Sequence, residues 1–393
     1  MEDADRQARW VRAVLLVFGL AGFELATWLG RLPDVRDAID ASTGAMAVLI
    51  LGLAVGSIGG LTVAGRMLPR LGAPRCVRLA AAAIAVGLAW AAAGAAAGAP
   101  LAVIAAGLAV FGAGHGLCDV SMNVSGAAVE RRRARPLMPW FHAAFSVGTL
   151  VGAGVAALLA AADVPLLAHA LVVAAVGGAA LARASRGFGE ERAPVHAHGT
   201  DSAAAGSSAW RDRRTLLIGV VVLGMTLAEG SANDWLALAM VDGHRTSNAG
   251  GTAAYAAFVA AMTVGRLLGP AVLERFGRAG VVRGCAALAT VGLLVLILAP
   301  GQELAFVGVV LWGFGASLGF PVGMSAAADD PARAASSVAV VATVGYVAFL
   351  AGPLLIGTLG DQVGLLDALG VVVVAVLLAG AVAGATRPPR HLA

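Results

Sequence analysis

Long apolar runs, separated by short polar segments, repeat along the whole chain and limit its possible folds more than any other feature. A helix that crosses a bilayer needs about 20 residues, and hydrocarbon offers no partner to an unpaired backbone group. We therefore expect an all-α membrane protein with about twelve transmembrane helices. The expected helices lie near 11–33, 43–64, 77–97, 101–128, 137–161, 165–183, 215–240, 251–273, 282–299, 303–327, 334–358 and 364–385.

The composition excludes several classes of protein. The chain is 59% hydrophobic and 13% charged, whereas soluble domains average about 45–50% and about 25%. These values are unlike those of an ordinary soluble enzyme, a disordered chain or a nucleic-acid-binding protein. Three cysteines, Cys76, Cys118 and Cys285, lie in apolar or inner-loop segments and indicate no disulfide framework. The lipid bilayer is the expected environment, and we expect no cofactor and no bound metal.

The arginines indicate the orientation of the expected helices. The sequence has no lysine, and with the N-terminus inside, the outer segments keep only Arg31, Arg36 and Arg245. Nearly all other arginines fall in inner segments, which is the bias that the positive-inside rule describes. The charged start, Met1 to Arg12, has no cleavage site after a short apolar core. We therefore expect a multi-pass protein of the inner membrane with both termini in the cytoplasm.

The chain also contains an internal repeat. Residues 183–214 form one long polar interruption, rich in Gly, Ser, Ala and charge, that is typical of a flexible linker. The segments on either side correspond at an offset of about 205, which aligns Glu24 with Glu229 and Gly72 with Gly277. We expect two pseudo-symmetric six-helix bundles, residues 1–183 and 215–393, joined by a cytoplasmic linker at 184–214.

Several motifs carry a resemblance to a known family. The loop Glu274-Arg275-Phe276-Gly277-Arg278 resembles the inner-loop signature of the major facilitator superfamily, and residues 69–72 match it with proline in place of the acid. Residues 114–123, 142–148 and 229–235 resemble a bacterial inner-membrane branch near the fucose-permease group. That group contains a proton–sugar symporter with functional carboxylates in its first and fourth helices. The resemblance implies a comparable role here for Glu24 and Asp119.

Ionisable groups at membrane depth cost roughly 2.5–3.5 kcal/mol on insertion scales, so each is a functional candidate. His115, Asp119 and Asn123 are four residues apart and share one stripe of a helix. Structural alternatives stay open: Glu229 as a structural partner of another helix, Asp119 as a buried acid paired with His142 or bonded to a serine, and tight packing of His115 among glycines. The candidate proton-coupling residues are Asp119, Glu24, Glu229 and His115.

Polar and aromatic side chains near these acids are candidates for contact with a solute. The hairpin formed by the fourth and fifth helices is expected to bring His142 near Asn123 and Ser146 near Asp119. Arg266 is expected to extend towards the inner membrane surface, and Glu130 to pair with the arginines of its loop. The candidate substrate-binding residues are Trp28, Asn123, His142, Ser146, Asn233 and Tyr346.

The function that these features favour is secondary transport by alternating access, with proton symport of a sugar-like or other small polar solute as the leading interpretation. The partners are then a small-molecule substrate and protons, and the protein is expected to be a monomer. Export of an amphipathic compound and a non-transporting membrane receptor remain alternatives. We expect no enzyme: residues 315–319 match G-x-S-x-G but lie within an apolar helix, where the hydrolase elbow cannot form.

Overall fold

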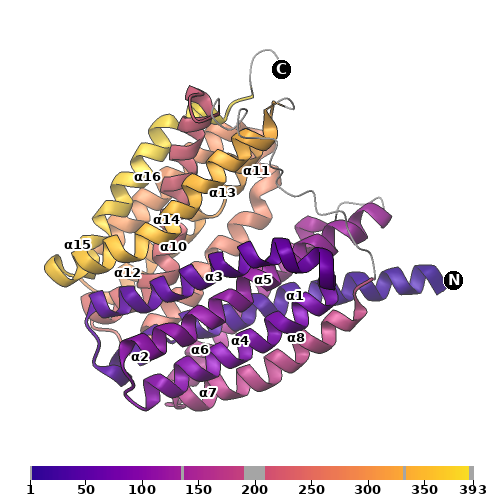
Figure 1. Cartoon of the computed structure of the whole chain (residues 1–393). Coiled ribbons are helices and arrows are strands. Elements are labelled where there is room, and N and C mark those ends of the chain that lie inside the picture. The colour runs from indigo at the N-terminus through magenta and orange to yellow at the C-terminus, as the bar shows by residue number, and fades with distance from the viewer. Residues whose placement is uncertain (1, 134–136, 190–208, 331–332, 389–393) are drawn as a thin grey trace. The chain divides into compact units, whose positions relative to one another are not determined.

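The computed structural model describes residues 2–133, 137–189, 209–330 and 333–388, and every regular element in these ranges is a helix (Figure 1). Contacts divide the chain into two compact units. The first comprises Met1–Ala197 with Asn248–Ala256, and the second His198–Ser247 with Ala257–Ala393. Most of the predicted linker, residues 190–208, lies outside the described residues.

The helices of the first unit are the predicted spans with small differences at their ends. They are α1 (Glu2–Leu29), α2 (Leu32–Ile39), α3 (Thr43–Leu71), α4 (Ala73–Ala96), α5 (Leu101–Arg133), α6 (Met138–Ala161), α7 (Leu166–Val172), the π-helix η1 (Val173–Gly177), α8 (Gly178–Ala184) and the short 3₁₀ helix η2 (Ser185–Gly187).

Local sequence signals set the beginnings of these helices. Ser42 precedes α3, and its hydroxyl oxygen accepts a hydrogen bond from the backbone N–H of Ala45 at 3.2 Å. The helices α4 and α6 each carry proline in their first turn, where the missing N–H has no intrahelical partner to lose. The short α2 follows α1 almost directly, so the first span continues past its predicted end.

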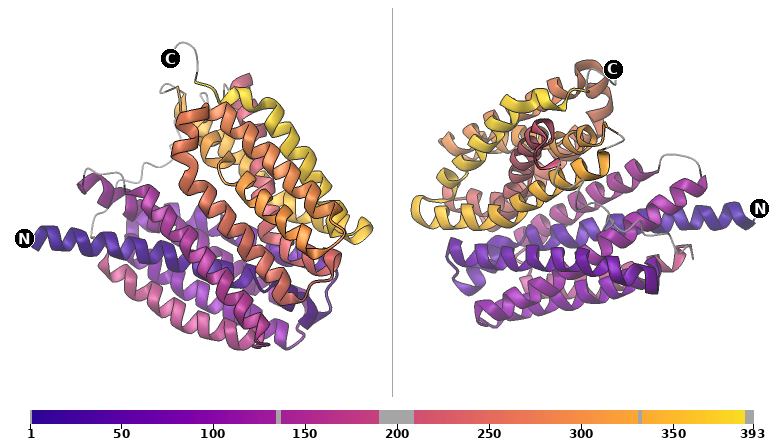
Figure 2. Two further views of the ribbon diagram at one scale, coloured as in Figure 1. Left: turned by 180° about the vertical axis from the view of Figure 1, so that it is seen from behind. Right: turned by 45° about the horizontal axis from the view of Figure 1, so that its top comes forward.

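Helices of the first unit pack side by side (Figure 2), and glycines lie at several of their contacts. A Cβ at Gly148 or Gly152 of α6 would collide with the backbone of α1, and one at Gly56 or Gly60 of α3 would collide with the backbone of α5. Small residues at these four positions let the helix backbones approach closely. Gly59 faces open space instead. The packing therefore places α6 along α1, and α5 against α3 and α4.

The second unit contains the remaining spans. They are α10 (Arg213–His244), α11 (Asn248–Leu298), α12 (Gln302–Ala316), α13 (Gly319–Ala327), α14 (Ala334–Val363), α15 (Leu365–Ala368), α16 (Gly370–Val382) and the 3₁₀ helix η4 (Ala383–Thr386). The first residues of α11, Asn248–Ala256, group with the first unit.

The described residues contain eleven helical stretches long and apolar enough to cross a membrane. One of them, α11, has 51 residues and would extend about 76 Å at 1.5 Å per residue, more than twice the hydrocarbon thickness. Its backbone leaves helical geometry at Gly277, with φ 66° and ψ 165°. This kink separates the two spans predicted at 251–273 and 282–299, so the described residues contain twelve transmembrane helices, as the sequence predicts.

The same backbone conformation recurs at the repeat-related position. Gly72, between α3 and α4, has φ 76° and ψ 160°, and Gly277 lies at the corresponding point of the second half. Positive φ favours glycine because it has no Cβ. The internal repeat therefore has a structural counterpart in the turn after the second helix of each half.

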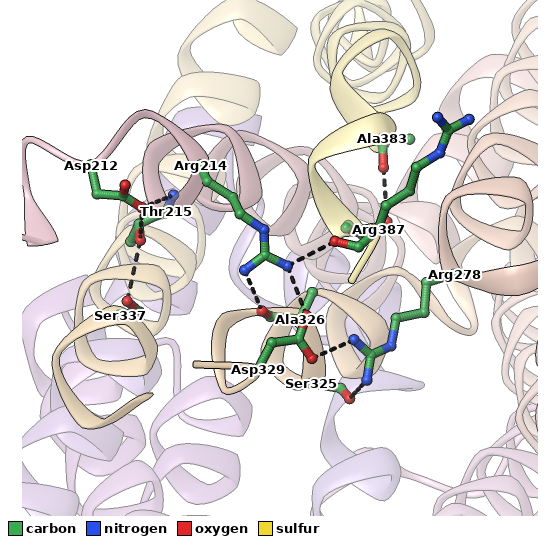
Figure 3. Close-up of polar contacts among 11 residues, drawn as sticks. Asp212, Arg214, Thr215, Arg278, Ser325, Ala326, Asp329, Ser337, Ala383 and Arg387 are labelled. Carbon is green, nitrogen blue, oxygen red and sulfur yellow. Dashed lines mark hydrogen bonds and ion pairs between the residues drawn. The ribbon is translucent and has the colours of Figure 1, made fainter. Parts of the chain in front are cut away.

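Charged side chains connect several segments at one end of the second unit (Figure 3). The carboxylate of Asp329 lies between Arg214 Nη2, at 2.8 Å, and Arg278 Nη1, at 2.6 Å. Arg214 also donates to the carbonyl oxygens of Ala326 and Arg387. These contacts link the start of α10, the turn within α11, the end of α13 and the segment after η4.

Candidate functional site

Glu24 lies on the buried face of α1. Val17, Ala21 and Trp28 continue the same stripe at helical spacing, and all three are buried. Glu24 is 0% exposed, and neither of its carboxyl oxygens has a hydrogen-bond partner among the described residues. Trp28 is only 2% exposed, so its indole ring packs within the protein in this structure.

The polar stripe of α5 has the geometry that its spacing predicts. The side-chain amide of Asn123 donates to the backbone carbonyl of Asp119 at 2.8 Å and to its Oδ1 at 3.1 Å. Asp119 is exposed at the surface of the unit, unlike Glu24. The ring of His115 meets Phe111 edge-on at 4.6 Å, and its Nε2 is buried with no partner among the described residues. The stripe therefore combines an accessible carboxylate with a histidine that packs into the helix bundle.

The two candidate residues of α6, His142 and Ser146, lie on a helix that packs mainly against α1. Near the loop between α5 and α6, Gly126 faces Met138 and Phe141, as a hairpin requires. The ring of His142 then meets Phe18 of α1 edge-on at 5.3 Å, and the side chain remains exposed. Ser146 is buried. Its predicted proximity to Asp119, and that of His142 to Asn123, stay predictions.

Glu130 has a different role from the expected ion pair within its loop. Its Oε2 accepts hydrogen bonds from the backbone N–H groups of Leu137 at 2.6 Å and Met138 at 2.8 Å. These are unpaired donors at the start of α6, where a negative charge is also favoured by the helix dipole. Glu130 therefore caps α6.

The second unit contains an ion pair at membrane depth. Arg266 Nη2 of α11 donates to both carboxylate oxygens of Glu229 on α10, at 2.9 and 3.0 Å. Arg266 Nε also donates to the carbonyl oxygen of Ser317 at 3.3 Å, where the helix is interrupted between α12 and α13. The expectation that Arg266 only extends towards the membrane surface is therefore wrong. The sequence offered one signal for this pairing, an acid and an arginine at membrane depth on consecutive helices.

The other candidates of the second unit differ in accessibility. Asn233, one helical turn after Glu229, is half-buried, and Tyr346 of α14 is 47% exposed. Among the described residues, no group of three or more His, Cys, Asp or Glu side chains has the geometry of a metal site. The exposed polar side chains could bind a solute through hydrogen bonds and ring stacking, and the carboxyl groups could carry protons.

Comparisons with known proteins agree with this architecture. The profile of the Major Facilitator Superfamily matches residues 14–353. A protein of Sinorhizobium fredii described as an uncharacterized transporter, y4wD, is 33% identical over 351 residues, which cover 89% of this chain and 91% of the relative.

Solved structures show the same fold at low sequence identity. The nucleoside transporter NupG has a TM-score of 0.70 at 14% identity, and the match covers 97% of this chain and 98% of NupG. The E. coli fucose:proton symporter FucP has a TM-score of 0.64 at 15% identity, over 96% and 98%. With twelve predicted spans, an internal repeat and a family match over most of its length, this chain belongs to the Major Facilitator Superfamily of membrane transporters.

Proposed function

We propose that this chain is a secondary active transporter that moves a small polar solute together with protons across the bacterial inner membrane by alternating access. Both termini then lie in the cytoplasm, as the arginine distribution predicts. The working partners are the solute, protons and the lipid bilayer, and the protein acts as a monomer.

The observation that carries this proposal is the uneven pairing of the acids at membrane depth. Glu229 has its charge balanced by Arg266. Among the described residues, Glu24 has no partner, and Asp119 has the amide of Asn123. A carboxyl group without a counter-ion can exchange a proton as its access to water changes. We therefore assign proton coupling first to Asp119 and Glu24, and next to His115. Glu229 takes part only through its ion pair with Arg266.

The solute is proposed to be sugar-like or similarly rich in hydroxyl groups. NupG and FucP, which share the fold, are a nucleoside transporter and a fucose:proton symporter. Asn123 and Asn233 offer hydrogen-bonding amides, and His142 and Tyr346 are exposed rings on which a sugar or base can stack. Trp28 and Ser146 are buried here, and they contact the solute only in another conformation.

Two experiments in sequence test this function. A thermal-shift screen of the purified protein against sugars, nucleosides, sugar acids and cationic dyes finds the class of ligand, since a ligand of the folded state raises the melting temperature. Proteoliposomes containing pyranine then report proton movement with the ligand so identified. We expect protons to enter with the solute, and Asp119→Asn to abolish accumulation but leave counterflow.

The matched control is Asp367→Asn, which neutralises an exposed acid of α15. It should leave accumulation at the level of the unmodified protein. Proton movement opposite to the solute would indicate an exporter instead, and solute movement without protons would refute coupling. Full accumulation by Asp119→Asn would remove Asp119 from the mechanism.

A further inference from the structure

The helix that packs against Glu24 is not an ordinary α-helix. The sixth span of the first unit changes from α7 to the π-helix η1, Val173–Gly177, and back to α8. π-helical turns are rare; they occur mostly as single turns inside α-helices, and frequently at functional sites. Here the turn interrupts an apolar span, and no proline in it explains the irregularity.

The last residue of this π-helical turn lies directly against the carboxyl group of Glu24. A Cβ at Gly177 would lie 2.5 Å from Glu24 Oε1 and 3.3 Å from its Cδ, so a larger residue at 177 would displace the carboxyl group from its present position. The same carboxyl is fully buried and has no hydrogen-bond donor among the described residues. The chain has therefore left space for an acid at this point without supplying a group that would balance its charge.

The surroundings of Glu24 contain few groups that could balance its charge. Cys118 of α5 is within electrostatic range of both Glu24 and Asp119. His169 of α7 lies near the start of the sixth span, before the π-helical turn, and it interacts there with Arg31 and Asp34. The helices that pack on α1 carry the following titratable and charged groups, none of which bonds to the carboxyl oxygens of Glu24: His115, Cys118, Asp119, Glu130, Arg131, Arg132 and Arg133 of α5, His142 of α6, Arg183 of α8 and Arg186 of η2.

We propose that Glu24 and the π-helical turn Val173–Gly177 form a buried proton-binding site inside the N-terminal unit, which is closed by Gly177 and opened when this turn moves away. The site holds a neutral carboxyl group, because ionisation in this position would leave a charge with no donor and no water contact. Movement of the turn admits water and releases the proton. This inference rests on the proposed proton coupling, and it assigns one of the coupled protons to the carboxyl group of Glu24.

The ligand of this site is a proton and not a metal ion. Sodium and other hard cations need several oxygen ligands around them. Among the described residues, no group of three or more His, Cys, Asp or Glu side chains could hold a metal ion, and neither carboxyl oxygen of Glu24 has a hydrogen-bond partner. One carboxyl group in an apolar setting can bind a proton but cannot replace the hydration shell of a cation.

Infrared spectroscopy of the purified full-length protein in lipid tests the proposal, because a protonated carboxyl group has its own carbonyl stretching band. The spectra are recorded near neutral pH without solute, in sodium and in choline buffers. We expect a protonated-acid band that Glu24→Gln removes, that Asp119→Asn and Gly154→Ala retain, and that Gly177→Ala shifts in frequency. Gly154 is the matched control, since a Cβ there has nothing within 4 Å.

Three results would overturn the proposal: no band that depends on Glu24, a band that sodium removes, or a band that Gly177→Ala leaves unchanged. If Gly177→Ala alone does not fold, the double variant Glu24→Ala, Gly177→Ala relieves the overlap. We expect this double variant to fold again. If it still fails to fold, the inferred contact between residue 177 and the Glu24 carboxyl group is refuted. These readouts need no transport, so uncoupled transport with the band present would refute only the proposed function.

Discussion

Asp329 is the residue at which a single substitution should most clearly weaken the second unit. Its carboxylate is 13% exposed on the side chain and accepts from Arg214 at 2.8 Å and from Arg278 at 2.6 Å. The two guanidinium groups are 29% and 30% exposed. Replacing Asp329 by Asn removes the negative charge that both arginines share and leaves them facing a neutral side chain.

The size of the effect follows from this partial burial. A hydrogen bond to a charged group contributes roughly 1.5–3 kcal/mol, and an exposed ion pair contributes about 0–1 kcal/mol. Asp329 has two such bonds in an intermediate setting, so we expect Asp329→Asn to lower the free energy of unfolding by about 2–3 kcal/mol. In a unit of this size that corresponds to a fall of about 5–10 °C in the melting temperature.

The assay is heat denaturation of the purified protein in one detergent, followed by loss of the monodisperse peak in size-exclusion chromatography. Asp367→Asn in α15 is the control, because this exposed acid should change stability by no more than about 0.5 kcal/mol. A fall in melting temperature for Asp329→Asn no larger than that of the control would refute the reasoning and show that solvent screens both ion pairs.

Three further predictions concern other contacts. The hydroxyl group of Thr215, in the first turn of α10, donates to the carboxylate of Asp212 and holds the pKa of Asp212 below its usual value. The stabilisation that ionised Asp212 gives the folded protein is therefore complete above about pH 4 and is lost as the pH falls through the lowered pKa. The difference in melting temperature between the parent protein and Asp212→Asn should therefore narrow from about pH 7 to about pH 3, and a constant difference would contradict this. Gly60→Ala should cost about 1–3 kcal/mol and reduce the yield of folded protein, because the added methyl group collides with α5, whereas Gly59→Ala faces open space and should not. Glu229→Gln and Arg266→Gln should each lower the melting temperature, because each leaves one charge of the pair without its partner. Exchanging the two charges, E229R with R266E, should recover most of the loss. No recovery in the exchanged variant would show that this ion pair does not stabilise the contact between α10 and α11.

Features that depend on the local order of residues along the chain could be predicted from the sequence. Continuous apolar runs of membrane length form helices in lipid, so the spans and their approximate ends follow from where apolar and polar segments alternate along the chain. The bond between Asn123 and Asp119 was predictable for the same reason, since residues four apart always meet on a helix. The positive φ at Gly72 and Gly277 is a conformation that glycine adopts readily because it has no Cβ.

Which helices adjoin, and therefore which group partners each buried charge, depends on the packing of the whole bundle. Glu24 and Glu229 occupy equivalent positions in the repeat, yet among the described residues one faces Gly177 without a partner and the other binds Arg266. Nothing within the first or seventh helix distinguishes them, because the difference comes from side chains on other spans. Pairing across helices depends on how glycine faces allow backbones to approach, and that is a property of the whole bundle.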